Sequence, residues 1–465
     1  MPDTTETDAF GRVEGRGIDY VPPAERHGRP RELFAIWASS NVNYLYLVLG
    51  GLLTLMGLTV WQGIAVVVAG NLFWLSIGLI AVSGTSSGTP TNVITRAMFG
   101  VRGNPAAVAL TSWTVGVGYV AINLAFGSLA GFAVLERTGQ PPGQAARLAV
   151  VGVCAAVTLA LCVYGHATIT RLSGWFTAGL SLAMLVLAGF VLAHADWGHA
   201  AAPAGGAPVW AVVLTGVGVI AAAPLSWGIS ADYARYLPTD SSPVAVTLWT
   251  TLGGFIPSVL LGSLGVLAGT AVDMTDPAKS LAAILPGWFY PLFLLVIVVG
   301  SVANNVITLY SNGLALQAMG VPLGRVASVL VNGLLGMGLA GYALFVTDFT
   351  STLSNVLQLS VAFLGPRCAI YVLDIWLRRN RYSGLALHDT SPGGPIWYAG
   401  GINWAGILAL ALGTLASTLC LHLTLYTGPV AGLLAGADTS VLVGPLVAGA
   451  LYLGLMKALY PVGAR

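Results

Sequence analysis

The sequence predicts an all-α membrane protein with twelve transmembrane helices. Of its 465 residues, 56% are hydrophobic and only 8% are charged, whereas soluble domains carry about 25% charged residues. A chain of this length with so few charges cannot cover itself with groups that face water, so its outer surface must face lipid. The net charge of +2 is too small for a nucleic-acid-binding surface. The four cysteines form no close pair of the kind that binds a metal.

Twelve apolar segments are long enough to cross a bilayer, because a spanning helix needs about 20 mostly apolar residues. A polar stretch rich in Pro and Gly, residues 1–32, precedes them and is expected to be a cytoplasmic tail. The eleventh segment contains His422, the one histidine well inside a predicted span, for which a packing role is expected. The predicted spans are residues 33–57, 60–84, 105–135, 146–165, 168–193, 209–230, 243–270, 284–312, 324–347, 350–377, 404–424 and 440–462.

Basic residues in the connections predict the orientation. With the N-terminus inside, fifteen of the 19 Lys and Arg residues fall on the inner side. Arg137, Arg147 and Lys279 fall on the outer side, and Arg367 lies within a span. The sequence therefore predicts a multi-pass protein of the cytoplasmic (inner) membrane with both termini in the cytoplasm. The inner connections include long polar stretches, such as residues 84–104, that suit gates or re-entrant elements.

No acidic residue falls in the middle of a predicted span. Asp232 follows the sixth span, and Asp374 lies at the edge of the tenth. Carboxylates inside a membrane mark proton relays, so this pattern argues against a proton carrier driven by a carboxylate. The sequence also lacks a nucleotide-binding P-loop, the motifs of membrane proteases and a potassium-channel filter. Among the classes of membrane protein considered, a carrier driven by an ion gradient remains.

Polar clusters interrupt four of the apolar spans. Residues 39–44 of the first span read SSNVNY. In the third span, Tyr119 and Asn123 are four residues apart and share one helix face. The sixth span contains Pro224 and Trp227, and the proline predicts an interrupted helix beside an aromatic ring that can stack on a planar ligand.

The eighth span carries polar side chains along much of its length. Hydrogen bonds between helices explain any one of these clusters taken alone. The breaks in the first and sixth spans, however, are separated by five helices, the pattern of two inverted repeats whose broken helices bind substrate and ion near the membrane midplane. The polar residues of the eighth span are Ser301, Asn304, Asn305, Thr308, Ser311 and Asn312.

Five stretches of the chain are long and unusual. They are RGIDYVPPAERHGRPRELF at residues 16–34, RAMFGVRGN at 96–104, LSWGISADYARYLP at 225–238, ANNVITLYSNGLALQAMG at 303–320 and GGINW at 400–404. These stretches resemble the nucleobase:cation symporter-1 (NCS1) family, specifically its bacterial purine-cytosine permease branch. The similarity runs in colinear order from about residue 14 to the end of the chain.

The resemblance implies a LeuT-like fold in which residues 33–193 and 209–377 form two inverted five-helix repeats and residues 404–462 add two helices. It also implies import of a nucleobase or related planar heterocycle, with cytosine or a purine preferred, by symport with Na⁺ or H⁺ and alternating access. A carrier of the same fold for a hydantoin, allantoin or a pyrimidine or pyridine vitamin stays open as an alternative. A membrane-embedded enzyme or a passive channel is less favoured, and no catalytic residue is expected.

The resemblance further implies which side chains bind the substrate. A planar heterocycle with ring N–H and C=O groups needs aromatic faces and amides that both donate and accept. In the third helix the family has an aromatic residue, Trp in many relatives, and an amide four positions later. The residues that match such roles here are Asn43, Tyr119, Asn123, Ser226, Trp227 and Asn305.

A Na⁺ site in this family lies between the first and eighth helices. The aligned positions are Ser39, Val42, Gly300, Ala303 and Asn304. Relatives commonly have two adjacent hydroxyls where this chain has Ala303, which offers no side-chain oxygen, and Asn304, which offers a carbonyl. Hard cations accept carbonyl oxygens. Na⁺ and H⁺ therefore both stay open as the coupling ion, and no other cofactor is expected.

Overall fold

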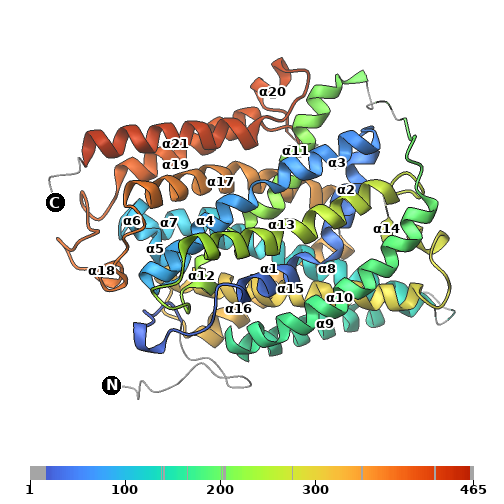
Figure 1. Cartoon of the computed structure of the whole chain (residues 1–465), viewed down its shortest axis with the longest axis horizontal. Coiled ribbons are helices and arrows are strands. Elements are labelled where there is room, and N and C mark those ends of the chain that lie inside the picture. The colour runs from blue at the N-terminus through green and yellow to red at the C-terminus, as the bar shows by residue number, and fades with distance from the viewer. Residues whose placement is uncertain are drawn as a thin grey trace.

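The computed structural model describes residues 17–460 apart from residues 138, 140–141, 165, 201, 203–205, 275, 347–348 and 424–425. Residues 1–16 of the predicted tail therefore lie outside the described part. Figure 1 shows a stack of helices that run in roughly the same direction. The main helices are α1 (Glu32–Asn41), α2 (Tyr44–Leu55), α3 (Val60–Asn71), α4 (Trp74–Ser87), α7 (Asn104–Val108), α8 (Thr114–Glu136), α9 (Gln144–Tyr164), α10 (His166–His194), α11 (Val209–Ser226), α13 (Pro243–Ala268), α15 (Tyr290–Ala318), α16 (Arg325–Phe345), α17 (Phe349–Leu377), α19 (Trp404–Cys420) and α21 (Ser440–Leu459).

Shorter helical segments connect the main helices. A π-helical turn at Ala109–Trp113 joins α7 to α8. The remaining short segments are α5 (Thr91–Ile94), α6 (Arg96–Phe99), α12 (Ala231–Ala234), α14 (Pro277–Ser280), α18 (Gly384–His388) and α20 (Pro429–Leu433).

Ten helical segments within the described residues are long and apolar enough to cross a bilayer, and the bent pair α1–α2 raises the number to 11. They coincide with the first ten predicted spans and the twelfth. The eleventh predicted span corresponds to α19, which is apolar but only 17 residues long. The expected place of His422 inside that span is wrong, because α19 ends at Cys420 and His422 forms an isolated bridge with Thr427.

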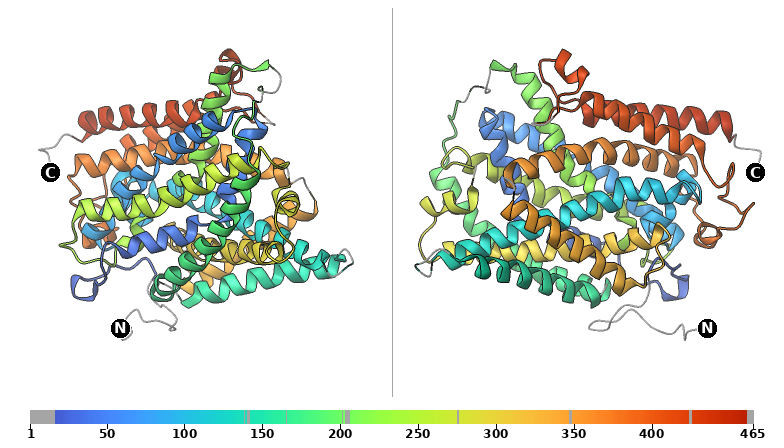
Figure 2. Two further views of the ribbon diagram at one scale, coloured as in Figure 1. Left: turned by 45° about the vertical axis from the view of Figure 1, so that its right-hand side comes forward. Right: turned by 180° about the vertical axis from the view of Figure 1, so that it is seen from behind.

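The helices differ strongly in how much of their surface is inside the protein. In the most apolar 18-residue window of the Asn104–Glu136 segment, 78% of the residues are buried, against 28% for α9 and for α10. The α8 part of that segment packs on α15 and α16, and α13 packs on α1, α2 and α4. The helices α19 and α21 pack on each other and on α17 at the edge of the stack (Figure 2). The core therefore lies around α8, α13 and α15, while α9 and α10 present side chains to the surroundings.

The connections predicted to lie inside gather at one end of the stack. In Figure 1, α5, α6, α12 and α18 lie at the left end, together with the end of α21, whereas α14 and α20 lie toward the other end. The polar stretch 84–104 is not a solvated connector, because Thr89, Thr91 and Asn92 are fully buried. We call the left end the inner end from here on.

The N-terminal segment, residues 17–31, is fixed to the inner end by hydrogen bonds. The amide of Val21 donates to the carbonyl of Gly88, and the amide of His27 donates to the carbonyl of Tyr236. The buried guanidinium of Arg26 donates to the carbonyl of Thr85 at 2.6 Å. This segment therefore touches the ends of both α4 and α12.

A buried carboxylate anchors the C-terminal helix pair at the same end. Asp374 of α17 is fully buried and accepts hydrogen bonds from Arg378, Tyr382 and Tyr452. Tyr452 belongs to α21, so this contact joins α17 to α21. Burial would lower the pKa of Arg378, but the Asp374 carboxylate raises it, and that pKa lies well above its usual value.

The packing of α13 on α2 depends on glycine at close helix contacts. A Cβ atom built at Gly265 would collide with the backbone carbonyl of Leu47, and small residues at such interfaces let helix backbones approach closely. We expect Gly265→Leu to destabilise the protein by more than the ~1–3 kcal/mol typical of overpacking, because backbone rather than a side chain must move. The melting temperature of the purified protein in detergent measures this.

The matched control for that substitution is Gly338→Leu. Gly338 lies on the exposed face of α16, where an added Cβ atom would meet no other atom within 4 Å. We expect the melting temperature of this variant to stay near that of the wild type. If the melting temperature falls equally in the two variants, Gly265 is not needed for the close approach of α2 and α13.

Candidate functional site

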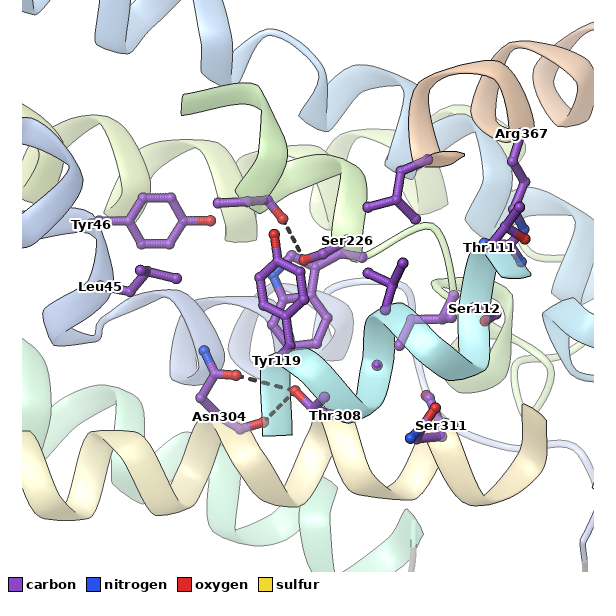
Figure 3. Close-up of a pocket in the computed structure, with 17 residues that line it drawn as sticks. Leu45, Tyr46, Thr111, Ser112, Tyr119, Ser226, Asn304, Thr308, Ser311 and Arg367 are labelled. Carbon is purple, nitrogen blue, oxygen red and sulfur yellow. Dashed lines mark hydrogen bonds between the residues drawn. The ribbon is translucent and has the colours of Figure 1, made fainter. Parts of the chain in front are cut away.

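A buried cavity lies at the centre of the helical stack, between the two broken helices (Figure 3). The cavity has a volume of about 30 Å³, so the side chains nearly close it. Tyr46 lies at one end in Figure 3, Tyr119 lies at the centre, and Arg367 lies at the other end near Thr111. The lining residues are Leu45, Tyr46, Thr111, Ser112, Val115, Gly116, Tyr119, Ala223, Ser226, Trp227, Ile229, Asn304, Thr308, Ser311, Asn312, Leu364 and Arg367.

The first break separates α1 from α2, whose axes differ in direction by 54°. Asn43 stabilises it from both sides: its side-chain oxygen accepts from the amide of Leu45 at 2.8 Å, and its amide nitrogen donates to the carbonyl of Ser40. Tyr46, one turn into α2, donates its hydroxyl to Asn41 at 2.7 Å and lines the cavity. The polar run of the first span therefore builds the break, and Asn43 caps a helix and does not line the cavity.

The second break follows Ser226, where α11 ends. Pro224 has no N–H to donate to the carbonyl one turn earlier, that of Ile220. Two carbonyls in the last turn of α11 accept hydrogen bonds from side chains. Ser226 donates its hydroxyl to Ala223 at 2.7 Å, and Tyr119 of α8 donates its hydroxyl to Ala222 at 2.9 Å. Tyr119 and Ser226 thus meet at this break, and both line the cavity.

Trp227 begins the non-helical segment and is 6% exposed. Its ring meets the ring of Trp37 edge to face, with centroids 5.5 Å apart. This contact comes from α1, so the two broken helices touch through aromatic side chains. The predicted grouping of Tyr119, Ser226 and Trp227 around one space agrees with the lining of the cavity.

The amides of α15 divide between two directions. Asn304 lines the cavity, where its nitrogen donates to the carbonyl of Ser40 at 2.9 Å and its oxygen accepts from Asn123 at 2.9 Å and from Thr308 at 3.2 Å. Asn305 instead donates to the backbone of Val120 at 3.1 Å and does not line the cavity. Asn304 therefore links α1, α8 and α15 at the cavity wall.

Asn123 does not line the cavity either, and its amide nitrogen holds the oxygen of Asn304. Of the six residues expected to bind substrate, three line the cavity and three pack behind its wall. The three that line it are Tyr119, Ser226 and Trp227, and the three that do not are Asn43, Asn123 and Asn305.

Several lining residues were not predicted. The π-helical turn before α8 brings Thr111 and Ser112 to the cavity, and such turns are frequent at functional sites. The amide of Asn92 donates to Ser112 at 3.1 Å, which ties the buried segment α5 to the cavity wall. Arg367 also lines the cavity. Its position as a single basic residue within an apolar span was the feature of the sequence that could have indicated this.

The residues expected to bind a coupling cation lie between α1 and α15. A Cβ atom built at Gly300 would be 3.7 Å from the carbonyl oxygen of Val42, so α15 approaches the first break closely there. Ser39 donates its hydroxyl to Ile36 at 2.8 Å, and Ala303 has no polar side chain. The amide nitrogen of Asn304, a donor, points to the carbonyl of Ser40. The two side chains of this set that carry an oxygen, Ser39 and Asn304, are therefore both engaged in hydrogen bonds within the protein.

The structure corrects the expectation that the spans contain no carboxylate. The sixth span does not end before Asp232, because the chain forms α12 after the break and the apolar segment extends to Ala234. Asp232 is fully buried, and one of its oxygens accepts from the amide of Thr91 at 2.7 Å. No hydrogen-bond partner of the other oxygen, Oδ2, occurs in the described part of the chain. The sequence had placed the end of this span at residue 230, two residues before Asp232.

Sequence comparisons relate the chain to membrane permeases along almost its whole length. Residues 20–444 match the profile of a family described as permeases for cytosine/purines, uracil, thiamine and allantoin. The chain is 28% identical over 470 residues to YxlA of Bacillus subtilis, which is named as a candidate purine-cytosine permease, covering 96% of each chain. It is 24% identical over 436 residues to the hydantoin permease of Microbacterium maritypicum, covering 88% of this chain and 85% of that one.

Solved structures give the same picture of the fold. Mhp1, a nucleobase-cation-symport-1 family transporter in a closed conformation with bromovinylhydantoin bound, superposes with a TM-score of 0.76 at 18% identity and covers 99% of this chain and 97% of its own. The inward-facing conformation of Mhp1 gives a TM-score of 0.73, also at 18% identity, and covers 96% of this chain and 95% of its own. The chain therefore has the fold of an NCS1 transporter.

Proposed function

This chain belongs to the family of permeases for cytosine/purines, uracil, thiamine and allantoin, and we propose that its central cavity binds a planar nitrogen heterocycle during transport by alternating access. It is a transporter and not an enzyme. The observation that carries this proposal is the convergence of both broken helices on one buried space lined by Tyr46, Tyr119 and Trp227. Rings of this kind offer their faces to a flat ligand.

The polar groups at the cavity wall suit the edges of such a ligand. Asn304 has an amide that both donates and accepts, and the hydroxyls of Ser226 and Thr308 line the same space. We propose that Asn304 is the amide that contacts the heterocycle. In this proposal Asn43, Asn123 and Asn305 act from behind the wall, by holding the first break, Asn304 and α8 in place.

Cytosine or a purine is our preferred substrate, because YxlA, which is similar along nearly the whole chain, is named as a candidate purine-cytosine permease. A hydantoin is the second candidate, because a hydantoin permease is also similar. The ring of Tyr119 is smaller than the tryptophan that many relatives have at this position, so it offers a flat ligand less stacking area.

We further propose twelve spans, with α19 as the eleventh, in the cytoplasmic membrane. Residues 33–193 and 209–377 would form the two inverted five-helix repeats, with the remaining pair at 404–462. The matching positions of the two breaks at the cavity support this arrangement. The gathering of the basic connections at the inner end supports an orientation with both termini in the cytoplasm.

For the coupling cation we favour H⁺ over Na⁺. Between α1 and α15 the side-chain oxygens of Ser39 and Asn304 are already hydrogen-bonded. Asp232, in contrast, is a buried carboxylate with one oxygen that no described residue contacts by a hydrogen bond. Buried carboxylates in membrane proteins commonly carry protons. The hydroxyl of Ser311, which lines the cavity, lies beside the carboxylate of Asp232.

A thermal-shift screen of the purified protein tests substrate and ion together, because a ligand stabilises only the state that it binds. Nucleobases, hydantoins, allantoin and pyridine vitamins are each measured with and without Na⁺. We expect a nucleobase to raise the melting temperature equally in Na⁺ and in K⁺ buffer. A shift that requires Na⁺ would contradict the choice of H⁺.

Counterflow in proteoliposomes then separates a carrier from a channel. An alternating-access carrier exchanges external labelled substrate for internal unlabelled substrate, so preloading should accelerate uptake. If preloading leaves the uptake rate unchanged, the proposed mechanism fails even when the ligand binds.

A further inference from the structure

Arg367 is a buried cation at the wall of the proposed substrate cavity. It follows Pro366 in the middle of α17, is 4% exposed, and lies at the end of the cavity away from Tyr46 (Figure 3). A guanidinium stays charged in proteins, and charged side chains at membrane depth are costly and mark functional sites. The proposed substrate contacts of Tyr119, Trp227 and Asn304 do not involve Arg367.

The described neighbours of Arg367 satisfy only part of its hydrogen-bonding capacity. A guanidinium has five N–H donors. Nη1 donates to the carbonyl of Gly228 at 3.2 Å, and Nη2 donates to the side-chain oxygen of Asn92 at 2.9 Å. The Nε atom is buried and has no partner in the described ranges. Both acceptors are neutral, so hydrogen bonds alone do not balance the charge.

The carboxylate of Asp232 acts on Arg367 electrostatically. Within the described residues no carboxylate lies within the 4.0 Å of an ion pair with Arg367. Asp232 also interacts with Arg235, so its charge is shared between two arginines. The Arg367 end of the cavity therefore retains positive charge, most of all when Asp232 carries a proton.

Hydroxyl side chains also line this end of the cavity, and none of the lining residues is acidic. Thr111 donates its hydroxyl to the carbonyl of Ala107 at 2.7 Å, and the oxygen of Ser112 accepts from Asn92 at 3.1 Å. The hydroxyl of Ser311 is buried beside the carboxylate of Asp232. Hydroxyls and a guanidinium together suit the oxygens of an anion, because hydrogen bonds to a charged acceptor are shorter and stronger than neutral ones.

From this arrangement, and resting on the proposed function of the cavity, we propose that the cavity binds an anionic planar heterocycle more tightly than a neutral one of similar shape. Its ring lies among Tyr46, Tyr119 and Trp227, and its negatively charged edge, a ring oxyanion or a carboxylate, binds Arg367 and the neighbouring hydroxyls. A neutral base fills the same space but leaves the charge of Arg367 unbalanced.

The test compares binding of matched neutral and anionic ligands to the purified full-length protein by calorimetry. Orotate is compared with uracil, which has the same ring without the carboxylate, and urate is compared with hypoxanthine. We expect the wild type to bind an anion about tenfold or more tightly than its neutral counterpart. A preference for orotate only points to a carboxylate, and a preference for urate only points to a ring oxyanion.

Variants separate recognition of charge from a structural role of Arg367. Arg367→Gln should abolish the preference for the anion, and Arg367→Lys should retain part of it. Arg325→Gln is the matched control, because Arg325 is also buried and donates to backbone carbonyls, those of Cys162 and Val163, but does not line the cavity. A purely structural role would weaken both ligands together and leave their ratio unchanged.

The wild-type comparison remains decisive even if Arg367→Gln does not fold. The inference is overturned if the wild type binds the anionic and the neutral ligand of each pair equally, or if it prefers the neutral ligand. It is also overturned if chloride stabilises the protein while neither pair shows a preference for the anion. Neutral bases that bind in a Trp227-dependent manner would leave the proposed function standing while the inference about charge fails. If no heterocycle binds to the wild type, both fail.

Discussion

Replacement of Trp227 by alanine should weaken binding of the heterocycle by about tenfold to a hundredfold, since an aromatic side chain that stacks on a base contributes ~1–3 kcal/mol. Trp227 lines the cavity directly after the second break, and its ring is positioned by Trp37. The dissociation constant of the best ligand from the thermal-shift screen, measured by calorimetry, checks this. Trp227→Phe keeps an aromatic face and should retain most of the affinity.

Trp175→Ala provides a matched control for Trp227→Ala. Trp175 lies on α10 with 77% of its surface exposed, so its loss should leave ligand binding unchanged. Trp227→Ala protein that melts at the wild-type temperature and binds the ligand with wild-type affinity would rule out Trp227 as a stacking residue.

Replacement of Asn304 by alanine should weaken binding by about tenfold or more. The substitution removes the proposed ligand contact and also leaves the carbonyl of Ser40 and the amide of Asn123 without their partner. Each buried polar group left without a partner costs ~1–3 kcal/mol. Calorimetry on the folded variant measures the loss, and the melting temperature separates it from general destabilisation.

Asn305→Ala is the informative comparison, because this neighbour donates to the backbone of Val120 and does not line the cavity. We expect a smaller loss of affinity there than in Asn304→Ala. A larger loss of affinity in Asn305→Ala than in Asn304→Ala would contradict this proposal. Asn305 would then contact the substrate, as the sequence analysis expected, and Asn304 would not.

This pair of residues illustrates what the sequence could and could not predict. Successive residues of a helix point about 100° apart, so only one of two adjacent asparagines can face a given cavity. The polar run identified the turn of α15 that lies at the cavity, but the rotation of the helix depends on packing against α8 and α1. Trp227 was easier to place at the cavity, because the proline and glycine beside it mark the break itself.

Arg367 could not be assigned from the sequence for a different reason. Its hydrogen-bond partners Asn92 and Gly228 are 275 and 139 residues away along the chain, so no local pattern connects them. The spans were predictable because each depends only on local apolar composition. The extent of the sixth span was not, since α12 is a single helical turn that continues the apolar segment beyond the break.

The attachment of residues 17–31 has a consequence for how the chain is assembled. This segment leaves the ribosome before all of the spans, yet its hydrogen-bond partners include Gly88, Tyr236 and His388, the last of which contacts the carbonyl of Ile18 at 3.0 Å. Docking of the segment must therefore wait until most of the spans have been synthesised and inserted. Closure of the inner end belongs to the last stage of biogenesis.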